Sequence, residues 1–137
     1  MFDNVVVGAT DSAGSAEALR RAIEVTQVSG GTLHIVTAFK SHRPTCPTMP
    51  EEFRYSIGSV DPVDYLLSEL ADRAGAAAVR VATHPVLARP VDAITKVATE
   101  EHADLIVVGG GAGHGSGHRT NVSKRIVAKA HCAVLVV

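Results

Sequence analysis

The residues best suited to bind a ligand form a glycine cluster in the last third of the chain. Six of the 12 glycines fall between Gly109 and Gly117, a cluster that begins at the last residue of the strand-like run 104–109. Glycines let the backbone approach a ligand closely and turn its N–H groups toward an anion. A helix expected around 121–130 would add its own free N–H groups and its dipole. This segment therefore suggests a phosphate-binding loop.

The cluster fits neither common phosphate-binding motif. G-x-x-x-x-G-K-[ST] and G-x-G-x-x-G are both absent between Gly109 and Gly117, and no lysine lies inside this loop. A flexible linker is the other interpretation that this composition allows. Three polar side chains close to the following helix, Thr120, Asn121 and Ser123, could still add hydrogen-bond donors to a phosphate.

A second candidate lies near the N-terminus, where the apolar run 4–9 is followed by Thr10, Asp11 and Ser12. The Asp11 carboxylate could accept hydrogen bonds from a ribose or help to hold a metal–phosphate group. The same carboxylate could also be the N-cap of the next helix, and the two roles are compatible.

Histidines raise a metal hypothesis for the same loop. His114 and His118 are four residues apart, and His131 and Cys132 follow. That spacing aligns ligands only on a helix, so in a glycine-rich loop we expect solvated histidines or an imidazole facing a phosphate. The two cysteines, Cys46 and Cys132, are too few for a disulfide framework, and we expect reduced thiols.

The elements that must position these residues alternate along the chain. Short apolar runs at 4–9, 32–39, 82–88, 104–109 and 133–137 predict strands, and helical patterns separate them. The order predicts a single-domain α/β protein over 1–137, with an open five-stranded parallel sheet and helices on both faces, Rossmann-like in type. Ligands bind such sheets outside the carboxyl ends of the strands, so both candidate loops can face one crevice. Pro85 places its strand at an edge, and the role of the irregular loop 40–60 stays open.

Composition excludes several classes of function. The formal net charge of -1 gives no basic footprint for nucleic acid or an anionic membrane. No apolar run approaches the ~20 residues of a membrane span, and the N-terminus has no basic segment or cleavage site, so we expect a cytoplasmic protein. No arrangement of nucleophile, base and orienting group predicts an enzyme.

Several segments in order resemble the universal stress protein family over essentially the whole chain. They are NVVVGATDSAGSAEALRRA, LHIVTAF, ARPVDAITKVATEEHADLIVVG and KRIVAKAHCAVLVV. The resemblance implies strand order 3-2-1-4-5. It also implies an adenine nucleotide, ATP or AMP with or without Mg²⁺, between the first and fourth strands.

The family's nucleotide signature, G-x2-G-x9-G-[ST], maps onto the glycine cluster. Gly109 matches its first glycine, Ala112 stands at the second, and its end is placed at Thr120 and Asn121, next to Val122 and Ser123. By the same resemblance Thr10 and Asp11 meet ribose and phosphate, Ala38 offers its main chain to adenine, and Gly111 and its neighbours offer a shifted register. The implied site is Ala9, Thr10, Asp11, Ala38, Gly109, Gly111, Ala112, Thr120, Asn121, Val122 and Ser123.

The last predicted strand, 133–137, has a short, apolar edge that is normally covered or paired. The resemblance implies a homodimer through this strand. Two functions therefore remain: a nucleotide-binding stress regulator, and a dimeric stress-response adaptor that binds no nucleotide because Ala112 and Thr120 replace glycines. Slow ATP hydrolysis is a third possibility, without a catalytic constellation to support it.

Overall fold

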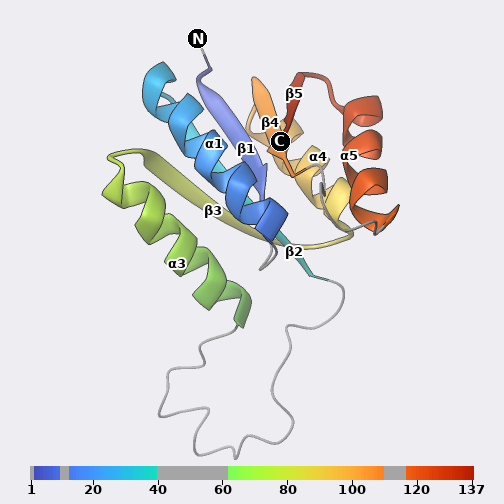
Figure 1. Cartoon of the computed structure of the whole chain (residues 1–137), viewed down its shortest axis with the longest axis horizontal. Helices are drawn as coiled ribbons and strands as arrows, with labels where there is room; N and C mark the ends of the chain where they lie inside the picture. The colour runs from blue at the N-terminus through green and yellow to red at the C-terminus, as the bar shows by residue number, and fades with distance from the viewer. Residues whose placement is uncertain (1, 10–12, 40–61, 110–116) are drawn as a thin grey trace, which may run out of the picture.

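The computed structural model describes residues 2–9, 13–39, 62–109 and 117–137, with the backbone alone for 13–14, 62–67 and 117–121. All strands are parallel in one sheet of order β3-β2-β1-β4-β5, which confirms the predicted fold (Figure 1). In chain order the elements are β1 (Asn4–Gly8), α1 (Ala13–Ser29), β2 (Thr32–Phe39), α3 (Pro62–Ala76), β3 (Arg80–Leu87), α4 (Pro90–Glu100), β4 (Leu105–Val108), α5 (Gly117–Lys129) and β5 (Ala133–Val136).

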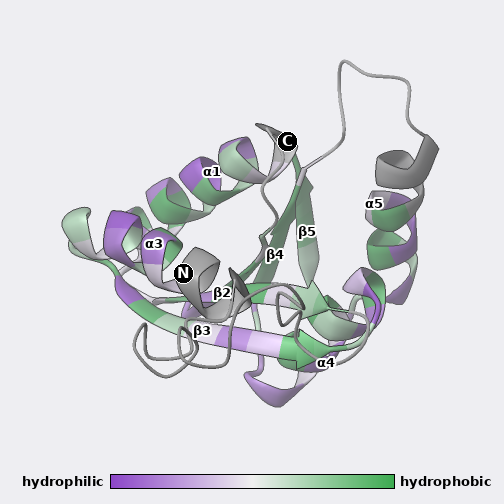
Figure 2. Cartoon of the chain, turned by 90° about the horizontal axis from the view of Figure 1, so that it is seen from below, coloured by the Kyte–Doolittle hydropathy of each residue, from purple (hydrophilic) through white to green (hydrophobic). Residues whose placement is uncertain are grey.

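The central strands are buried on both faces, as their unbroken apolar runs predict. Val5, Val6 and Val7 of β1 are fully buried. Alternate side chains enter two cores: α1 and α3 cover the face of Val5 and Val7, while α4 and α5 cover the face of Val6. Figure 2 shows α1 and α3 on one side of the sheet and α4 on the other.

Three sequence predictions about elements need correction. α5 begins at Gly117 rather than near 121, and β3 begins at Arg80 rather than at 82. The apolar pattern of this helix predicts that Val122, Ile126 and Val127 face the core; Ile126 is buried, but Val127 is 55% exposed because it follows Ile126 around the helix toward solvent. The edge position of β3, predicted from Pro85, is confirmed.

At the amino edge of the sheet, the Asp104 side chain links the start of β4 to the start of β1. The Asp104 carboxylate accepts hydrogen bonds from the N–H groups of Asp3 (2.7 Å) and Asn4 (3.0 Å), about a hundred residues earlier in the chain. Gly30, with φ of +72°, ends α1, and Thr32 N–H then donates to the Asp3 carbonyl at 2.9 Å. These contacts fix the register of β1 between β2 and β4.

Within the part of the chain that the structure describes, no helix has the length and apolarity needed to cross a membrane.

Candidate functional site

The carboxyl edge of the sheet brings together the strand ends from which the two predicted ligand loops begin. β1 and β4 are neighbours, with Val5 opposite Leu105 and Val7 opposite Val107. Ala9 and Gly109 therefore leave the sheet side by side at the same edge. Ala9 is buried, and its N–H donates to the Val36 carbonyl at 2.8 Å.

The structure describes part of the predicted site. Of its members, Ala9, Ala38, Gly109, Val122 and Ser123 are described, and all lie at or near the carboxyl edge. Thr10, Asp11, Gly111 and Ala112 lie outside the described residues, as do His114 and Cys46. The backbone of Thr120 and Asn121 belongs to α5, and their side chains and that of His118 lie outside the described part.

Ser123 closes the base of the glycine-rich loop. Its hydroxyl donates a hydrogen bond to the Gly109 carbonyl at 2.9 Å, and the side chain is buried. Counted strictly from Gly109, the family spacing ends at Val122 and Ser123 rather than at Thr120 and Asn121. The first and last positions of the signature are therefore in direct contact.

A cleft of about 990 Å³ opens at the carboxyl edge, on the face covered by α4 and α5. The end of β2, the β3–α4 junction and one side of α5 form its walls. Its lining residues are Phe39, Leu87, Ala88, Arg89, Pro90, Val91, Asp92, Val122, Arg125, Ala128 and Lys129. The cleft thus reaches from Phe39, which is next to the predicted site residue Ala38, to Val122, which is itself a predicted site residue.

The charges around this cleft favour an anion. Three cations, Arg89, Arg125 and Lys129, face one carboxylate, that of Asp92. Lys129 Nζ lies 3.6 Å from Asp92 Oδ1, so this exposed pair offsets one positive charge. The two arginines then leave the lining with net positive charge, and guanidinium groups suit phosphate oxygens.

Helix α4 begins inside the cleft with an unusual N-cap. Arg89 occupies the cap position in extended conformation (φ -69°, ψ 153°), and it makes no side-chain capping hydrogen bond. N-caps are normally Ser, Thr, Asp or Asn, and the positive end of the helix dipole disfavours a cation there. A bound anion would offset both the dipole and the arginine charge.

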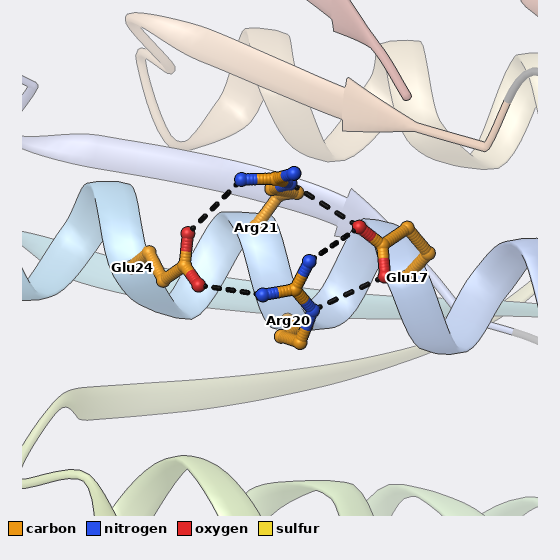
Figure 3. A network of polar contacts seen from close by, with 4 residues as sticks. All are labelled: Glu17, Arg20, Arg21 and Glu24. Carbon is orange, nitrogen blue, oxygen red and sulfur yellow. Dashed lines mark hydrogen bonds and ion pairs between the residues drawn. The ribbon is translucent and has the colours of Figure 1, made fainter.

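The other prominent charges are paired among themselves on α1. Figure 3 shows Arg20 and Arg21 between Glu17 and Glu24, with N···O distances from 2.7 to 3.5 Å. Hydrogen bonding to Arg20 lowers the pKa of Glu17. This exposed network has no net charge, so it does not compete with the cleft for an anion.

Arg89 and Arg125 are the site residues that sequence reasoning missed. Arg89 directly precedes Pro90, which marks a helix start, so a cation at a helix N-terminus was visible in the sequence. Arg125 gave no such signal, because it reaches the same cleft as Arg89 only through the packing of α5 against α4.

The described structure does not support a metal site at His131 and Cys132, the two residues before β5. His131 is exposed, and Cys132 is a half-buried free thiol just before β5. Burial, with the nearby Asp104 charge, raises the pKa of Cys132 and so disfavours the thiolate that a metal needs.

Comparison with known proteins identifies the family. The model of the universal stress protein family matches residues 1–137. The universal stress protein Rv1636 of Mycobacterium tuberculosis (strain H37Rv) is 29% identical over 110 residues, which cover 79% of this chain and 75% of that protein.

Solved structures show the same fold. A crystal structure of a universal stress protein in complex with cAMP is 30% identical, with a TM-score of 0.76, and covers 99% of this chain and 97% of that one. A universal stress protein family protein of Arabidopsis thaliana with AMP bound has a TM-score of 0.70 over 98% of this chain and 90% of that one. At 17% identity, the latter is similar in fold alone.

Proposed function

The chain belongs to the universal stress protein family, and we propose that it is a cytoplasmic regulatory protein that binds an adenine nucleotide at the carboxyl edge between β1 and β4. The observation that carries the proposal is the cationic cleft that runs from Phe39, next to Ala38, to Val122. The cleft adjoins the end of β4, because Ser123, the neighbour of Val122, donates a hydrogen bond to the Gly109 carbonyl. The 30%-identical relative solved with cAMP supports the ligand class.

The lining of the cleft divides into parts that suit a nucleotide. Ala88 and Val122, partly buried residues of the lining, offer apolar surface to a base. Arg89 and Arg125 offer charge to phosphate oxygens, and the predicted partners Thr10 and Asp11 come directly after Ala9 in the sequence. ATP and AMP, with or without Mg²⁺, are the proposed ligands.

The proposed assembly is a homodimer through β5. This strand forms one edge of the sheet, and its side chains Leu135 and Val136 are 37% and 46% exposed. An apolar edge strand with free backbone groups is normally covered, and a two-fold contact with a second copy would cover it.

The experiment that tests the function is direct. The purified protein is denatured and any released adenine nucleotide is separated by chromatography; thermal melts are then recorded with ATP or AMP, with and without Mg²⁺. A ligand at ~100 times its dissociation constant adds ~2.7 kcal/mol to the unfolding free energy, which shifts the melt. Asp11→Ala should abolish the shift, and Arg73→Ala, an exposed arginine on α3, should leave it unchanged.

The alternative function has its own outcome. No released nucleotide and no shift at millimolar ATP or AMP would overturn nucleotide binding. A homodimer in that case would support the adaptor that binds no nucleotide.

A further inference from the structure

A cluster of metal-ligating side chains lies at the end of α4 remote from the nucleotide cleft. His34 of β2, His84 of β3 and Glu101, the C-cap of α4, bring one ligand atom each to within 4.8 Å of one another. α4 starts in the cleft at Pro90, and at 1.5 Å per residue Glu101 lies about 16 Å away. The cluster is thus separate from the proposed nucleotide site.

The sheet register places both histidines on the same face. His34 pairs with Ala82 of β3, and His84 lies two residues further along that strand, so their side chains point to the α4 side. His34 Nδ1 lies 2.9 Å from His84 Nε2, and the ring centroids are 5.1 Å apart. Two imidazole nitrogens therefore already face each other across neighbouring strands.

The far side of the His34 ring is held by Asn4. His34 Nε2 lies 3.0 Å from the Asn4 side-chain oxygen, which accepts only, so Nε2 carries the proton and the Nδ1 lone pair accepts a hydrogen bond from His84 Nε2–H. Metal-binding histidines usually donate their second ring N–H to an oxygen in this way, because it fixes both tautomer and orientation. Zn²⁺ binding replaces the hydrogen bond between the two histidines, and the proton of His84 moves from Nε2 to its other ring nitrogen or to water.

The donor set and its access suit zinc. Two imidazoles and one carboxylate bind Zn²⁺ at about 2.0–2.2 Å, which sets ligand atoms about 3.4 Å apart in a tetrahedron. To bind the ion, the two histidine nitrogens, now 2.9 Å apart, must separate by a few tenths of an ångström. The Glu101 carboxylate, now within 4.8 Å of them, must move closer to both. His34 is buried, whereas His84 and Glu101 are half-buried, so an ion can enter from their side.

We propose that His34 Nδ1, His84 Nε2 and the Glu101 carboxylate bind one Zn²⁺ ion, with water at the fourth position and Asn4 orienting His34. The ion links β2, β3 and the C-terminal end of α4. Its binding does not depend on nucleotide binding at the other end of that helix.

The test uses the full chain without an affinity tag, stripped of metal by chelation and titrated with Zn²⁺ by calorimetry. We expect one ion per chain. His84→Ala and Glu101→Gln should each weaken binding at least about tenfold, and Asn4→Ala should weaken it about 10–100-fold. His131→Ala removes an exposed histidine and is the matched control, which should bind as the parent does.

Two further measurements keep the test decisive. Circular dichroism verifies that each variant is folded, and Zn²⁺ should raise the melting temperature of the parent but not of His84→Ala. Co²⁺ in place of Zn²⁺ should give visible bands without a thiolate charge-transfer band. Absence of binding at 100 µM Zn²⁺, unchanged affinity in folded His84→Ala, loss of binding in His131→Ala, or a thiolate band would overturn the proposal. Asp11→Ala should retain zinc binding, which separates this test from that of the nucleotide site.

Discussion

Ser123 and Gly109 are joined by a 2.9 Å hydrogen bond from the serine hydroxyl to the glycine carbonyl, across 14 residues of chain. The bond fastens the first half of α5 to the end of β4. It thereby joins the first residue of the glycine-rich segment to the helix that follows the segment. The same hydroxyl proton is not available to a phosphate while this bond is formed.

Ser123→Ala should lower the unfolding free energy by about 1 kcal/mol, because the part-buried Gly109 carbonyl loses this donor. Urea denaturation measures the change. Ser68→Ala, at an exposed position on α3, is the control and should have almost no effect. Equal stability of Ser123→Ala and the parent would mean that the bond contributes nothing.

Arg125→Ala and Arg89→Ala should each weaken adenine nucleotide binding about tenfold, because each removes a cation from the cleft lining. Calorimetric titration with AMP measures the affinity, and added salt should weaken parental binding. Arg73→Ala is the control. If both cleft variants bind AMP as the parent does, the phosphates lie elsewhere.

Leu135→Arg should yield a monomer if β5 forms the dimer contact, because it places a charge on the exposed apolar edge. Light scattering after gel filtration gives the mass. Val28→Arg makes the same change at a valine of α1 that is 80% exposed and should leave the assembly intact. A parental mass of one chain at micromolar concentration would contradict the dimer.

Gly31→Ala should destabilise the fold by about 1–3 kcal/mol, because the new Cβ would lie 2.6 Å from the Asp3 carbonyl oxygen. Gly75→Ala, in α3 with open space around it, should instead stabilise by about 0.5 kcal/mol. Thermal and urea unfolding compare the two variants. Opposite signs are expected, and a neutral Gly31→Ala would show that the start of β2 can shift.

Cys132 should react slowly with iodoacetamide at pH 8, because burial and the Asp104 charge raise its pKa above the ordinary value of 9.0. In the Cys46→Ser variant, Cys132 is the one remaining thiol, so the measured rate is its own. The rate of the same variant unfolded in urea is the control. Since the folded thiol holds its proton longer than the unfolded one, this group's contribution to stability is complete below pH 9.0 and is lost as pH rises through the folded pKa. Equal rates in the folded and unfolded states would contradict the shift.

Most of the fold was predictable because local patterns carry it. The valine run of β1 and the regular spacing of Ala18, Leu19 and Ala22 in α1 required burial on a sheet, whatever the partner. Pro85 required an edge. Boundaries such as the start of α5 were less certain, because the glycine-rich segment before it has no strong signal of its own.

For the candidate site, the sequence could predict which edge of the sheet it lies at but not which side chains line it. The sequence by itself determined that Gly109 and the residues after Ala9 follow strands, since apolar runs of that length can only be buried. Only the tertiary structure decided that Arg89 meets Arg125 in one cleft, and that His34, His84 and Glu101 meet at the other end of α4. Those contacts join residues far apart in the chain, and their distances depend on strand register and helix packing, which no local pattern encodes.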